Sequence, residues 1–282
     1  MRQGIIVTLA FVLGFCLLIY FSTHYPLSEP WVNITVSLLL NMLATPIYLW
    51  IAKLLTNFHR VPLWFRTQVI YRKSYVRLSI SYLFRIRVKG KYLLVRNGRG
   101  DYYQLVGGAY KTLPGAESVF DRYKVITDSR FETDHGIAKN DLRFRVPGRH
   151  VLAMLKWFDS RQNREISQWR EFCEELLTTN ILPKHPFRYI DYKYACTVQS
   201  HMQEAKQLQC QEILLFEIYD LVPNDEQQKL LEDLLDEGDT AEVKWADEVL
   251  IRSLGFDHRN KKEEYRIGPH TKWALNEQWS ND

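Results

Sequence analysis

The sequence has few cysteines and no two of them close together, no internal repeat and no low-complexity tract. Its four cysteines form no C-x-x-C motif; they are Cys16, Cys173, Cys196 and Cys210. That distribution argues against a zinc site or a disulfide framework and fits a reduced cytosol. Because no segment repeats at a fixed period, a solenoid or propeller architecture is not expected.

Charge is absent from two long stretches near the N-terminus. Residues 4–22 and 31–52 are runs of 19 and 22 residues without Lys, Arg, Asp or Glu. A helix of about 20 such residues crosses a hydrocarbon core of about 30 Å. The first run is longer than the apolar core of a signal peptide, which has about 7–15 residues, and a second run follows at once. We therefore expect a transmembrane helical hairpin in residues 1–55, with spans at about 4–22 and 31–52.

Acidic residues are nearly absent from the first hundred positions. Residues 53–99 carry twelve Lys or Arg and no acid, whereas the loop between the two apolar runs carries only His24 and Glu29. The positive-inside rule then places both termini in the cytoplasm, and the basic collar suits anionic lipid head groups. Residues 1–100 sum to 13 minus 1, or +12, and residues 101–282 to 24 minus 32, or −8. Since topology explains the basic excess, no DNA partner is expected.

Polar side chains recur along the second apolar run. Asn33, Ser37, Asn41 and Thr45 follow at intervals of four residues and lie along one slowly drifting stripe of a helix. Two interpretations stay open: packing of the two helices within the hairpin, or a membrane seam between subunits or the lining of a pore. Polar side chains in hydrocarbon usually face protein or water, so both interpretations give the stripe a role beyond anchoring.

The remaining chain predicts an α+β domain at residues 75–282, joined to the hairpin by a basic, aromatic juxtamembrane linker at 56–74. Alternating apolar residues bounded by turn residues predict strands at 75–88, 92–95, 102–106, 189–197 and 212–221. Helical periodicity predicts helices at 151–158, 165–178, 225–236 and 246–254. This order of elements is typical of a mixed sheet with helices packed on it.

Three glutamates fall within five residues in the segment 168–177, QWREFCEELL. The apolar residues of this segment recur with the helical period and form one face, which leaves Glu171, Glu174 and Glu175 on the opposite face. Like charges at these spacings cost roughly 0.2–0.5 kcal/mol per pair. A solvated helix face tolerates that repulsion, and a bound metal ion would offset it. The spacing alone therefore leaves both interpretations open.

Residues 170–175, R-E-F-C-E-E, match the R-E-U-x-E-E core of the Nudix box, in which U is a bulky aliphatic residue. The strand ending in Gly107 and Gly108 is similar to the strand and glycine pair that open such a box. Residues 242–250 and 267–275 are similar to the closing strand, helix and tail. The chain therefore resembles a Nudix domain over most of residues 80–275.

The match departs from the family pattern inside the box. Gly108 lies 62 residues before Arg170 instead of 14, so about 48 residues are inserted, within a long insertion at about 109–164. Counting back from Arg170, Lys156 stands at the position of the box glycine and Gln162 at that of the first glutamate. The loop that closes over a diphosphate in Nudix hydrolases is thus rebuilt.

Two membrane helices followed by a Nudix-like domain with this insertion resemble the SMODS-associated Nudix effectors of CBASS, bacterial antiphage systems that signal through cyclic oligonucleotides. The resemblance implies a protein of the bacterial inner membrane and a cyclic di- or trinucleotide made by a partner CD-NTase. It also implies that the ligand promotes homo-oligomerisation and that the transmembrane helices then disrupt the lipid bilayer, which causes abortive infection. The domain would be a sensor rather than an enzyme, with no catalytic residue and no required cofactor.

Candidate ligand-binding residues follow from the chemistry of a nucleotide. Phosphodiester oxygens are bound by Arg, Lys and backbone N–H groups, and bases by aromatic faces or amide edges. Residues 142–150 of the insertion, LRFRVPGRH, supply basic side chains, although an ion pair with one of the glutamates is an equally good role for each arginine. The expected contacts are Arg143, Arg145, Arg149, His150, Tyr103, Lys111, Glu171, Glu174, Glu175 and His270, and Arg143 and Arg145 would share one face of a strand.

Two other functions stay open. In Nudix hydrolases the acidic helix binds Mg²⁺, and Glu171, Glu174 and Glu175 could supply the ligands of a membrane-tethered hydrolase acting on a nucleoside diphosphate derivative. That alternative lacks a first glutamate at the expected spacing, for which Glu165 is the nearest substitute. A membrane adaptor without a ligand is the third possibility.

Overall fold

The computed structural model describes residues 14–17, 19–21, 23–25, 30, 32–41, 48, 61–98, 100–127, 140–205 and 208–275. The chain divides into two compact units, Met1–Trp64 and Phe65–Asp282. In the first unit residues 32–41 are helical. Among the described residues, no helix combines the length and apolar character that crossing a bilayer requires. The expected spans at 4–22 and 31–52 lie largely outside the described residues and stay a prediction.

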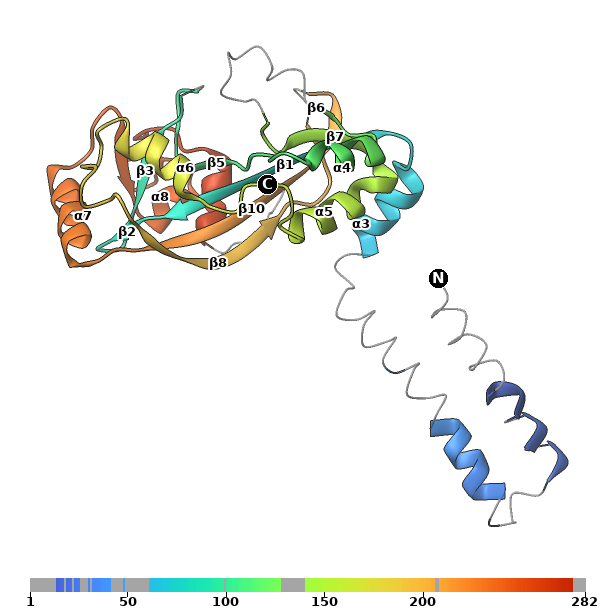
Figure 1. Ribbon diagram of the computed structural model, residues 1–282. Coiled ribbons are helices and arrows are strands. Elements are labelled where there is room, and N and C mark those ends of the chain that lie inside the picture. The colour runs from blue at the N-terminus through green and yellow to red at the C-terminus, as the bar shows by residue number, and fades with distance from the viewer. Residues whose placement is uncertain are drawn as a thin grey trace. The chain divides into compact units, whose positions relative to one another are not determined.

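From residue 61 onward the chain contains both helices and strands (Figure 1). The helices are α3 (Val61–Phe65), α4 (Ala116–Tyr123), α5 (Val151–Asp159), α6 (Trp169–Phe172), α7 (Asp225–Glu237) and α8 (Glu248–Arg252). Shorter π- and 3₁₀-helical segments are η2 (Arg66–Ile70), η4 (Gly148–His150), η5 (Cys173–Leu177) and η6 (Pro269–Leu275). The strands are β1 (Tyr75–Arg85), β2 (Arg87–Val88), β3 (Lys91–Arg96), β4 (Tyr103–Gln104), β5 (Gly107–Ala109), β6 (Ile126–Thr127), β7 (Arg143–Pro147), β8 (Asp191–Gln199), β9 (Gln203–Ala205), β10 (Cys210–Val222), β11 (Val243–Ala246), β12 (Phe256–Asp257) and β13 (Lys262–Glu263).

A seven-stranded mixed sheet forms the centre of the second unit. Its order is β6-β7-β1-β10-β8, with β5 also paired to β1 and β9 also paired to β10. The β1–β10 pair is parallel, and the other pairs are antiparallel. A second sheet has the order β11-β3-β2, with β4 paired to β3, and β12 and β13 form a separate hairpin. The α+β class with a mixed sheet is therefore confirmed.

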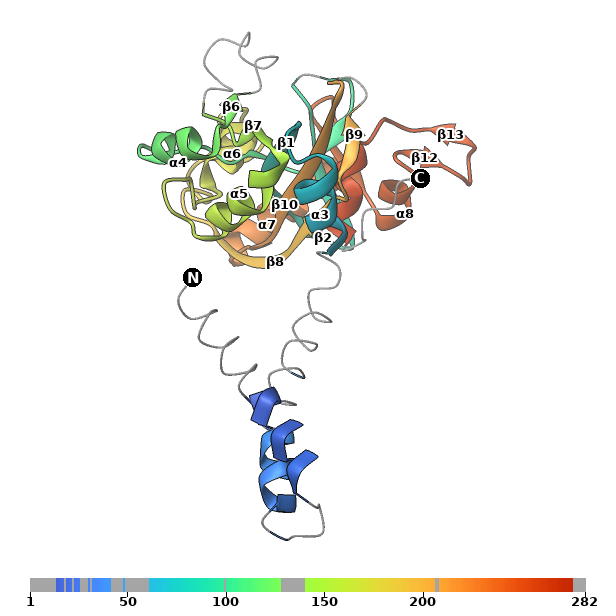
Figure 2. The ribbon, with the colours of Figure 1, turned by 90° about the vertical axis from the view of Figure 1, so that its right-hand side faces the viewer.

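Strand β1 is buried on both faces, which its alternating sequence did not predict. Every residue from 76 to 84 is buried, including Arg77, Ser79 and Ser81. The reason is that β1 is an interior strand, with β10 along one edge and β7 and β5 along the other, in a sheet that has elements packed on both of its faces (Figure 2). Arg77 meets Glu212 on β10 in an ion pair of 2.9 Å, which satisfies the buried charge.

An aromatic core fills the space between β1 and the acidic helix. Tyr82 packs on Tyr110 with ring centroids 4.8 Å apart, and Phe84 packs on Phe172 of α6 at 5.7 Å. Tyr110 and Tyr219 donate their hydroxyls to the buried carboxylate of Glu217. Figure 2 shows α4, α5 and α6 on one side of β1 and β10, and α8 with the β12–β13 hairpin on the other. The central sheet is thus covered on both sides.

Two expected helices are confirmed, and capping explains where each begins. Asn224 precedes α7 and accepts the N–H of Gln227 at 2.9 Å, while the Gln227 side chain accepts the N–H of Asn224 at 3.1 Å. This reciprocal capping box satisfies two donors at the helix start. Asp247 caps α8 by accepting the N–H of Leu250 at 2.8 Å, so α8 starts two residues after the expected position.

Two expected elements have different bounds. The helix expected at 165–178 begins only at Trp169 and continues as the π-helical η5 from Cys173. The residues before it are extended because Arg164 forms an isolated β-bridge with Thr112. In addition, the Glu165 N–H donates to the Lys111 carbonyl at 2.8 Å. Within the strand expected at 102–106, only Tyr103 and Gln104 form a strand, β4, which joins the second sheet, and β5 of the central sheet begins just after that range, at Gly107.

Candidate functional site

The glycine pair of β5 lies against the acidic helix although the two are far apart in sequence. The Gly107 N–H donates to Glu175 Oε2 at 2.8 Å, across 68 residues. Gly107 has φ +149°, and a Cβ there would lie 2.1 Å from the Tyr82 carbonyl oxygen. A Cβ on Gly108 would lie 2.1 Å from Glu171 Oε1. Glycine at 107 therefore allows β5 to lie this close to β1, and a side chain at 108 would displace the Glu171 carboxylate.

Arg170 holds the acidic side chains together. Its Nε donates to Glu165 Oε1 at 3.1 Å, and its Nη1 donates to Glu171 Oε1 at 2.6 Å. A longer contact of 3.4 Å reaches Glu174 Oε2, and Nη2 donates to the Ala109 carbonyl at 2.8 Å. Burial alone would lower the pKa of Arg170, but its hydrogen bond with Glu165 and the Glu171 charge raise it above its ordinary value. Arg170 thus contacts Glu165, which precedes it in the sequence, and Glu171 and Glu174, which follow it.

The three glutamates of the helix have different surroundings. The Glu171 side chain is 14% exposed and that of Glu174 is 51% exposed. Burial raises the pKa of Glu175 to about 8, and the Glu171 charge acts in the same direction while the Gly107 N–H opposes it. Burial also raises the pKa of Glu171, against the lowering effect of Arg170. The solvated-face interpretation therefore holds for Glu174 only.

These carboxylates do not fit a metal ion as they are arranged. Glu171 is bound by Arg170, Glu175 by the Gly107 N–H, and Glu174 extends toward solvent. Over the described part of the chain, no group of three or more His, Cys, Asp or Glu side chains could hold a metal ion. Glu165, the nearest substitute for the first box glutamate, is held by Arg170 and by the Lys111 N–H at 3.1 Å.

Two of the expected basic residues lie beside the acidic cluster. Lys111 Nζ and Arg143 Nη1 reach the two oxygens of Asp141 at 2.9 and 3.5 Å. The Asp141 charge in turn contributes to the raised pKa of Glu171. Arg143 and Arg145 alternate with the buried Phe144 and Val146 along β7, so they share one face of that strand. Lys111, Asp141 and Arg143 thus form a basic rim next to the glycine pair.

Arg149 and His150 lie in a different place. They belong to η4, beyond the end of β7, and the five residues of β7 alone span ~13 Å at ~3.3 Å per residue. The Arg149 carbonyl accepts the Gln68 side chain at 3.2 Å, and the Arg149 N–H donates to the Arg72 carbonyl at 3.2 Å. His150 packs on Tyr123, and burial lowers its pKa. Arg149 therefore contacts the segment that holds Gln68 and Arg72, and His150 contacts Tyr123 of α4.

Of His270 and Tyr103, only His270 is near the basic rim, where the Arg143 charge acts on it. His270 stacks on Phe216 with centroids 5.8 Å apart, and its Nε2 lies 3.1 Å from Gln104 Oε1. Burial lowers the pKa of His270 to about 4, and the Arg143 charge acts in the same direction, so the ring is neutral at pH 7. Tyr103 donates its hydroxyl to the Ala241 carbonyl at 2.7 Å, which ties it to the second sheet.

Sequence reasoning missed two members of this cluster. Asp141 joins Lys111 to Arg143, and Phe216 supplies the ring under His270. No local motif marks either residue, because each reaches the site only through strand pairing. The signal for Arg170 was present in the R-E-U-x-E-E hexad, but its part in joining Glu165 to the helix needed coordinates.

The model of one protein family, described as the SMODS-associated NUDIX domain, matches residues 75–275 of this chain. Comparisons with curated proteins and with solved structures give no match. The matched region includes the glycine pair, the acidic helix and the basic rim, and it ends with η6 at residue 275.

Proposed function

The chain belongs to the SMODS-associated NUDIX domain family, and from that premise we propose that it is a membrane effector of cyclic-oligonucleotide antiphage signalling. Its Nudix-like domain binds a cyclic di- or trinucleotide made by a partner CD-NTase. Binding favours a homo-oligomer of the full chain. The hairpin of residues 1–55, anchored in the bacterial inner membrane with both termini in the cytoplasm, then disrupts the bilayer.

One observation supports a sensor rather than a hydrolase: glutamates of the acidic helix are bound by other groups of this same chain. Glu171 is bound by Arg170, and Glu175 is bound by Gly107 and has a pKa of about 8. A protonated carboxyl is a hydrogen-bond donor as well as an acceptor, which suits recognition of a neutral base edge. These contacts support a role for Glu171 and Glu175 in positioning β5 and the acidic helix for ligand binding.

The basic rim supports binding of a phosphodiester. Lys111 and Arg143 bring two positive charges to a single carboxylate, Asp141. Their side chains are each 22% exposed, so both remain accessible from solvent. Charge-assisted hydrogen bonds from such groups are the strong contacts to phosphate oxygens. The neutral ring of His270, stacked on Phe216, offers an aromatic surface for a base at the same rim.

A direct connection leads from the basic rim to the juxtamembrane segment. Strand β7 begins at Arg143 and ends at Pro147, and the next residue, Gly148, donates its N–H to the Ser74 carbonyl at 2.9 Å. A Cβ on Gly148 would lie 2.1 Å from the Tyr71 carbonyl oxygen and 3.0 Å from that of Thr67. A ligand that moves β7 therefore moves η2, which precedes Tyr71 in the chain. Such a shift is limited by the difference in ligand affinity between the two states.

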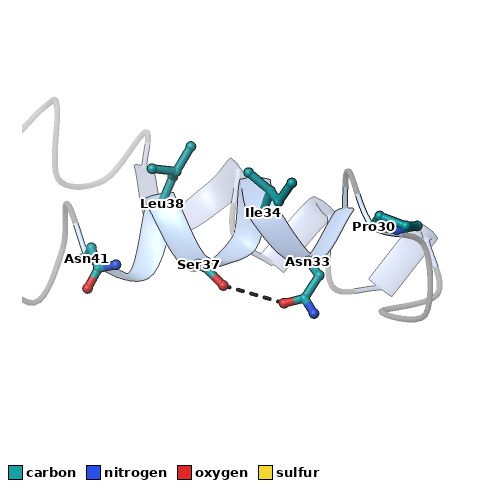
Figure 3. A pocket seen from close by; sticks show the side chains of 6 residues that line it. All are labelled: Pro30, Asn33, Ile34, Ser37, Leu38 and Asn41. Carbon is teal, nitrogen blue, oxygen red and sulfur yellow. Dashed lines mark hydrogen bonds between the residues drawn. The ribbon is translucent and has the colours of Figure 1, made fainter.

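The polar stripe of the second apolar run supports a membrane seam. Pro30, Asn33, Ile34, Ser37, Leu38 and Asn41 line a pocket on the surface of this helix. In Figure 3, Asn33, Ser37 and Asn41 lie along one side, and Ser37 donates to Asn33 Oδ1 at 3.4 Å, while Ile34 and Leu38 lie on the other side. Thr45 lies outside the described residues. Helices in a bilayer associate through such polar contacts.

A membrane-tethered hydrolase is the second candidate, and the contact between the glycine pair and the acidic helix favours it. Glu171 and Glu175 lie beside Gly107 and Gly108 despite the long insertion, as an intact box would place them. Under this candidate, changing Glu174 and Glu175 to Gln abolishes turnover of nucleoside diphosphate derivatives. Under the sensor proposal the same variant changes affinity only.

A thermal-shift screen of the full chain in detergent micelles tests the sensor. Cyclic di- and trinucleotides are added, and each sample is checked by chromatography for ligand breakdown. A ligand at 100 times its dissociation constant adds about 2.7 kcal/mol to the free energy of unfolding. We expect one cyclic nucleotide to stabilise the chain and to remain intact. Consumption of linear nucleoside diphosphates, with no stabilisation by any cyclic nucleotide, would favour the hydrolase.

Two arginine variants localise the ligand. Arg143→Met should weaken the affinity of the stabilising nucleotide roughly 10- to 100-fold, because hydrogen bonds to charged groups contribute about 1.5–3 kcal/mol. Arg149→Met makes the same change of charge beyond the far end of β7 and should leave the affinity within about threefold of the original. Isothermal titration of both variants measures the difference. Equal losses would move the ligand away from the acidic cluster.

The membrane seam is tested by Asn41→Leu. The variant should reduce ligand-induced dye leakage from proteoliposomes roughly 3- to 20-fold, because a polar contact between membrane helices is worth about 0.6–1.7 kcal/mol. Ligand binding by the cytoplasmic domain should not change. Leu39→Ala, at a position of the same helix that does not line this pocket, is the matched control. Unchanged leakage from Asn41→Leu would remove that residue from the seam.

A further inference from the structure

The juxtamembrane helix presents an apolar face to solvent. Segments α3 and η2 follow one another without a break from Val61 to Ile70. On η2 and the residue before it, the exposed fractions are 50% for Phe65, 54% for Val69 and 57% for Ile70. Trp64 is 52% exposed. Figure 2 shows α3 in the foreground, at the surface of the described chain. Large apolar side chains gathered in this way mark an interaction surface.

The opposite side of the same segment is fixed to the domain. Thr67 is fully buried, and Gln68 donates to the Arg149 carbonyl at 3.2 Å. Arg66 Nη1 donates to the Met202 carbonyl at 2.7 Å. The outer side chains Phe65, Val69 and Ile70, which we call the η2 apolar face, are therefore held outward by contacts that leave the helix little freedom to turn them in.

Charge around this face points to one kind of partner. Residues 53–73 carry five Lys or Arg and no Asp or Glu, and Arg72 and Lys73 are exposed. A helix with an apolar face, an aromatic residue and basic neighbours binds at the interface of a bilayer that contains anionic lipid. Only residues 53–60 separate the expected span from Val61, a distance of at most ~29 Å even when extended.

We propose that the η2 apolar face docks into the interface of an anionic phospholipid bilayer. The inference rests on the membrane anchorage in the proposed function and deepens it. Phe65, Val69 and Ile70 enter the boundary between head groups and acyl chains, and Arg72 and Lys73 bind phosphate groups of the lipid. Because Gln68 and Thr67 lie against the turn after β7, docking sets the orientation of the basic rim relative to the membrane surface.

The test uses the full chain in nanodiscs of phosphatidylcholine with phosphatidylglycerol. Cys16, Cys173, Cys196 and Cys210 are replaced by Ser, and a single cysteine is introduced by Val69→Cys or Ile70→Cys for an environment-sensitive fluorophore. Val249→Cys on α8, where Val249 is 64% exposed, is the matched control. An interfacial face lies about 5–10 Å below the head groups, within reach of bromine on lipid acyl chains.

We expect brominated lipids to quench the labels at 69 and 70 at least about twofold more than the label at 249, and quenching to fall when phosphatidylglycerol is omitted. Equal quenching at all positions overturns the proposal. A blue-shifted emission that bromine does not quench, and that disappears in discs holding one copy, assigns the face to a second copy and also overturns it. Carbonate extraction distinguishes failure of the proposed anchorage from failure of the docking proposal. Release of the chain from membranes would contradict the anchorage, whereas a chain that stays inserted but shows no quenching would contradict only the docking.

Discussion

Replacing Gly148 by alanine is expected to give a protein that still binds its nucleotide but no longer opens the membrane. Gly148 does not have a positive φ, so alanine is compatible with the backbone conformation. The obstacle is space, because the new Cβ would lie 2.1 Å from the Tyr71 carbonyl oxygen and 2.8 Å from its carbon. Backbone atoms cannot rotate away as a side chain can, so the segment from Thr67 to Tyr71 has to move.

The size of the effect follows from this displacement. Overpacking costs about 1–3 kcal/mol of folding stability. A lost coupling free energy of about 1–3 kcal/mol lowers ligand-induced output roughly 5- to 150-fold. Calorimetry of the nucleotide complex measures binding, and dye release from proteoliposomes measures output. Affinity should remain within about threefold, because the basic rim lies at the other end of β7.

The matched control for this variant is Gly98→Ala. Gly98 also lacks a positive φ, and a Cβ there meets no atom within 4 Å. It should behave as the original protein in stability, binding and leakage. If Gly148→Ala releases dye at the original ligand concentration, the signal does not pass through the contact between η4 and the juxtamembrane segment.

Replacing Glu175 by glutamine is expected to stabilise the protein increasingly as pH rises from about 4.3 to about 8, and to have little effect below that window. The pKa of Glu175 in the fold is about 8, because burial and the Glu171 charge disfavour its ionised form. In the unfolded chain a glutamate has a pKa of about 4.3. Between these values the folded state binds more protons than the unfolded state, so stability falls as pH rises.

The linkage relation sets the size of the pH effect. One proton difference corresponds to a slope of up to about 1.4 kcal/mol per pH unit, and the loss is complete once pH exceeds about 8. Glutamine stays neutral and keeps an acceptor for the Gly107 N–H. Melting temperatures measured from pH 4 to pH 9 should therefore be similar for the two proteins at pH 4, below the unfolded pKa of about 4.3, and diverge in favour of Glu175→Gln as pH rises toward about 8.

Glu174→Gln is the control for that experiment. Its side chain is 51% exposed and lies 3.4 Å from Arg170, and its charge is a lesser cause of the raised pKa of Glu175 than burial or the Glu171 charge. Removing that charge should therefore change the pH dependence of stability much less than Glu175→Gln does. A constant difference between Glu175→Gln and the original protein at every pH would mean that Glu175 is ionised throughout, and the interpretation of its burial would be wrong.

The contacts of the acidic segment could be predicted only where they depend on local pattern. The hexad at 170–175 and the glycine pair at 107–108 are short motifs, and their proximity follows from the family resemblance. The separate surroundings of Glu174 and Glu175 could not be predicted, because helical periodicity puts both on one face. The π-helical turn of η5 and the approach of β5 decide which one is buried.

The separation of the basic residues into two groups also could not be predicted from the sequence. Residues 142–150 contain Arg143, Arg145, Arg149 and His150 within nine positions, which made one cluster the natural expectation. The alternation predicted the shared face of Arg143 and Arg145 because it depends only on strand geometry. The turn at Gly148 sends the chain to a different neighbour, and that neighbour, Tyr71, belongs to a segment without any motif.

The parallel pairing of β1 with β10 has a consequence for the order of events during synthesis. It joins residues 135 positions apart, as in the pair of Arg77 and Glu212. At about 5–20 residues per second, a ribosome needs roughly 7–27 s to make the partner strand after β1 emerges. The central sheet therefore closes only when three quarters of the chain exists, long after the N-terminal apolar runs have left the exit tunnel. On this timetable the proposed anchor enters its bilayer before the sensor is able to recognise any signal.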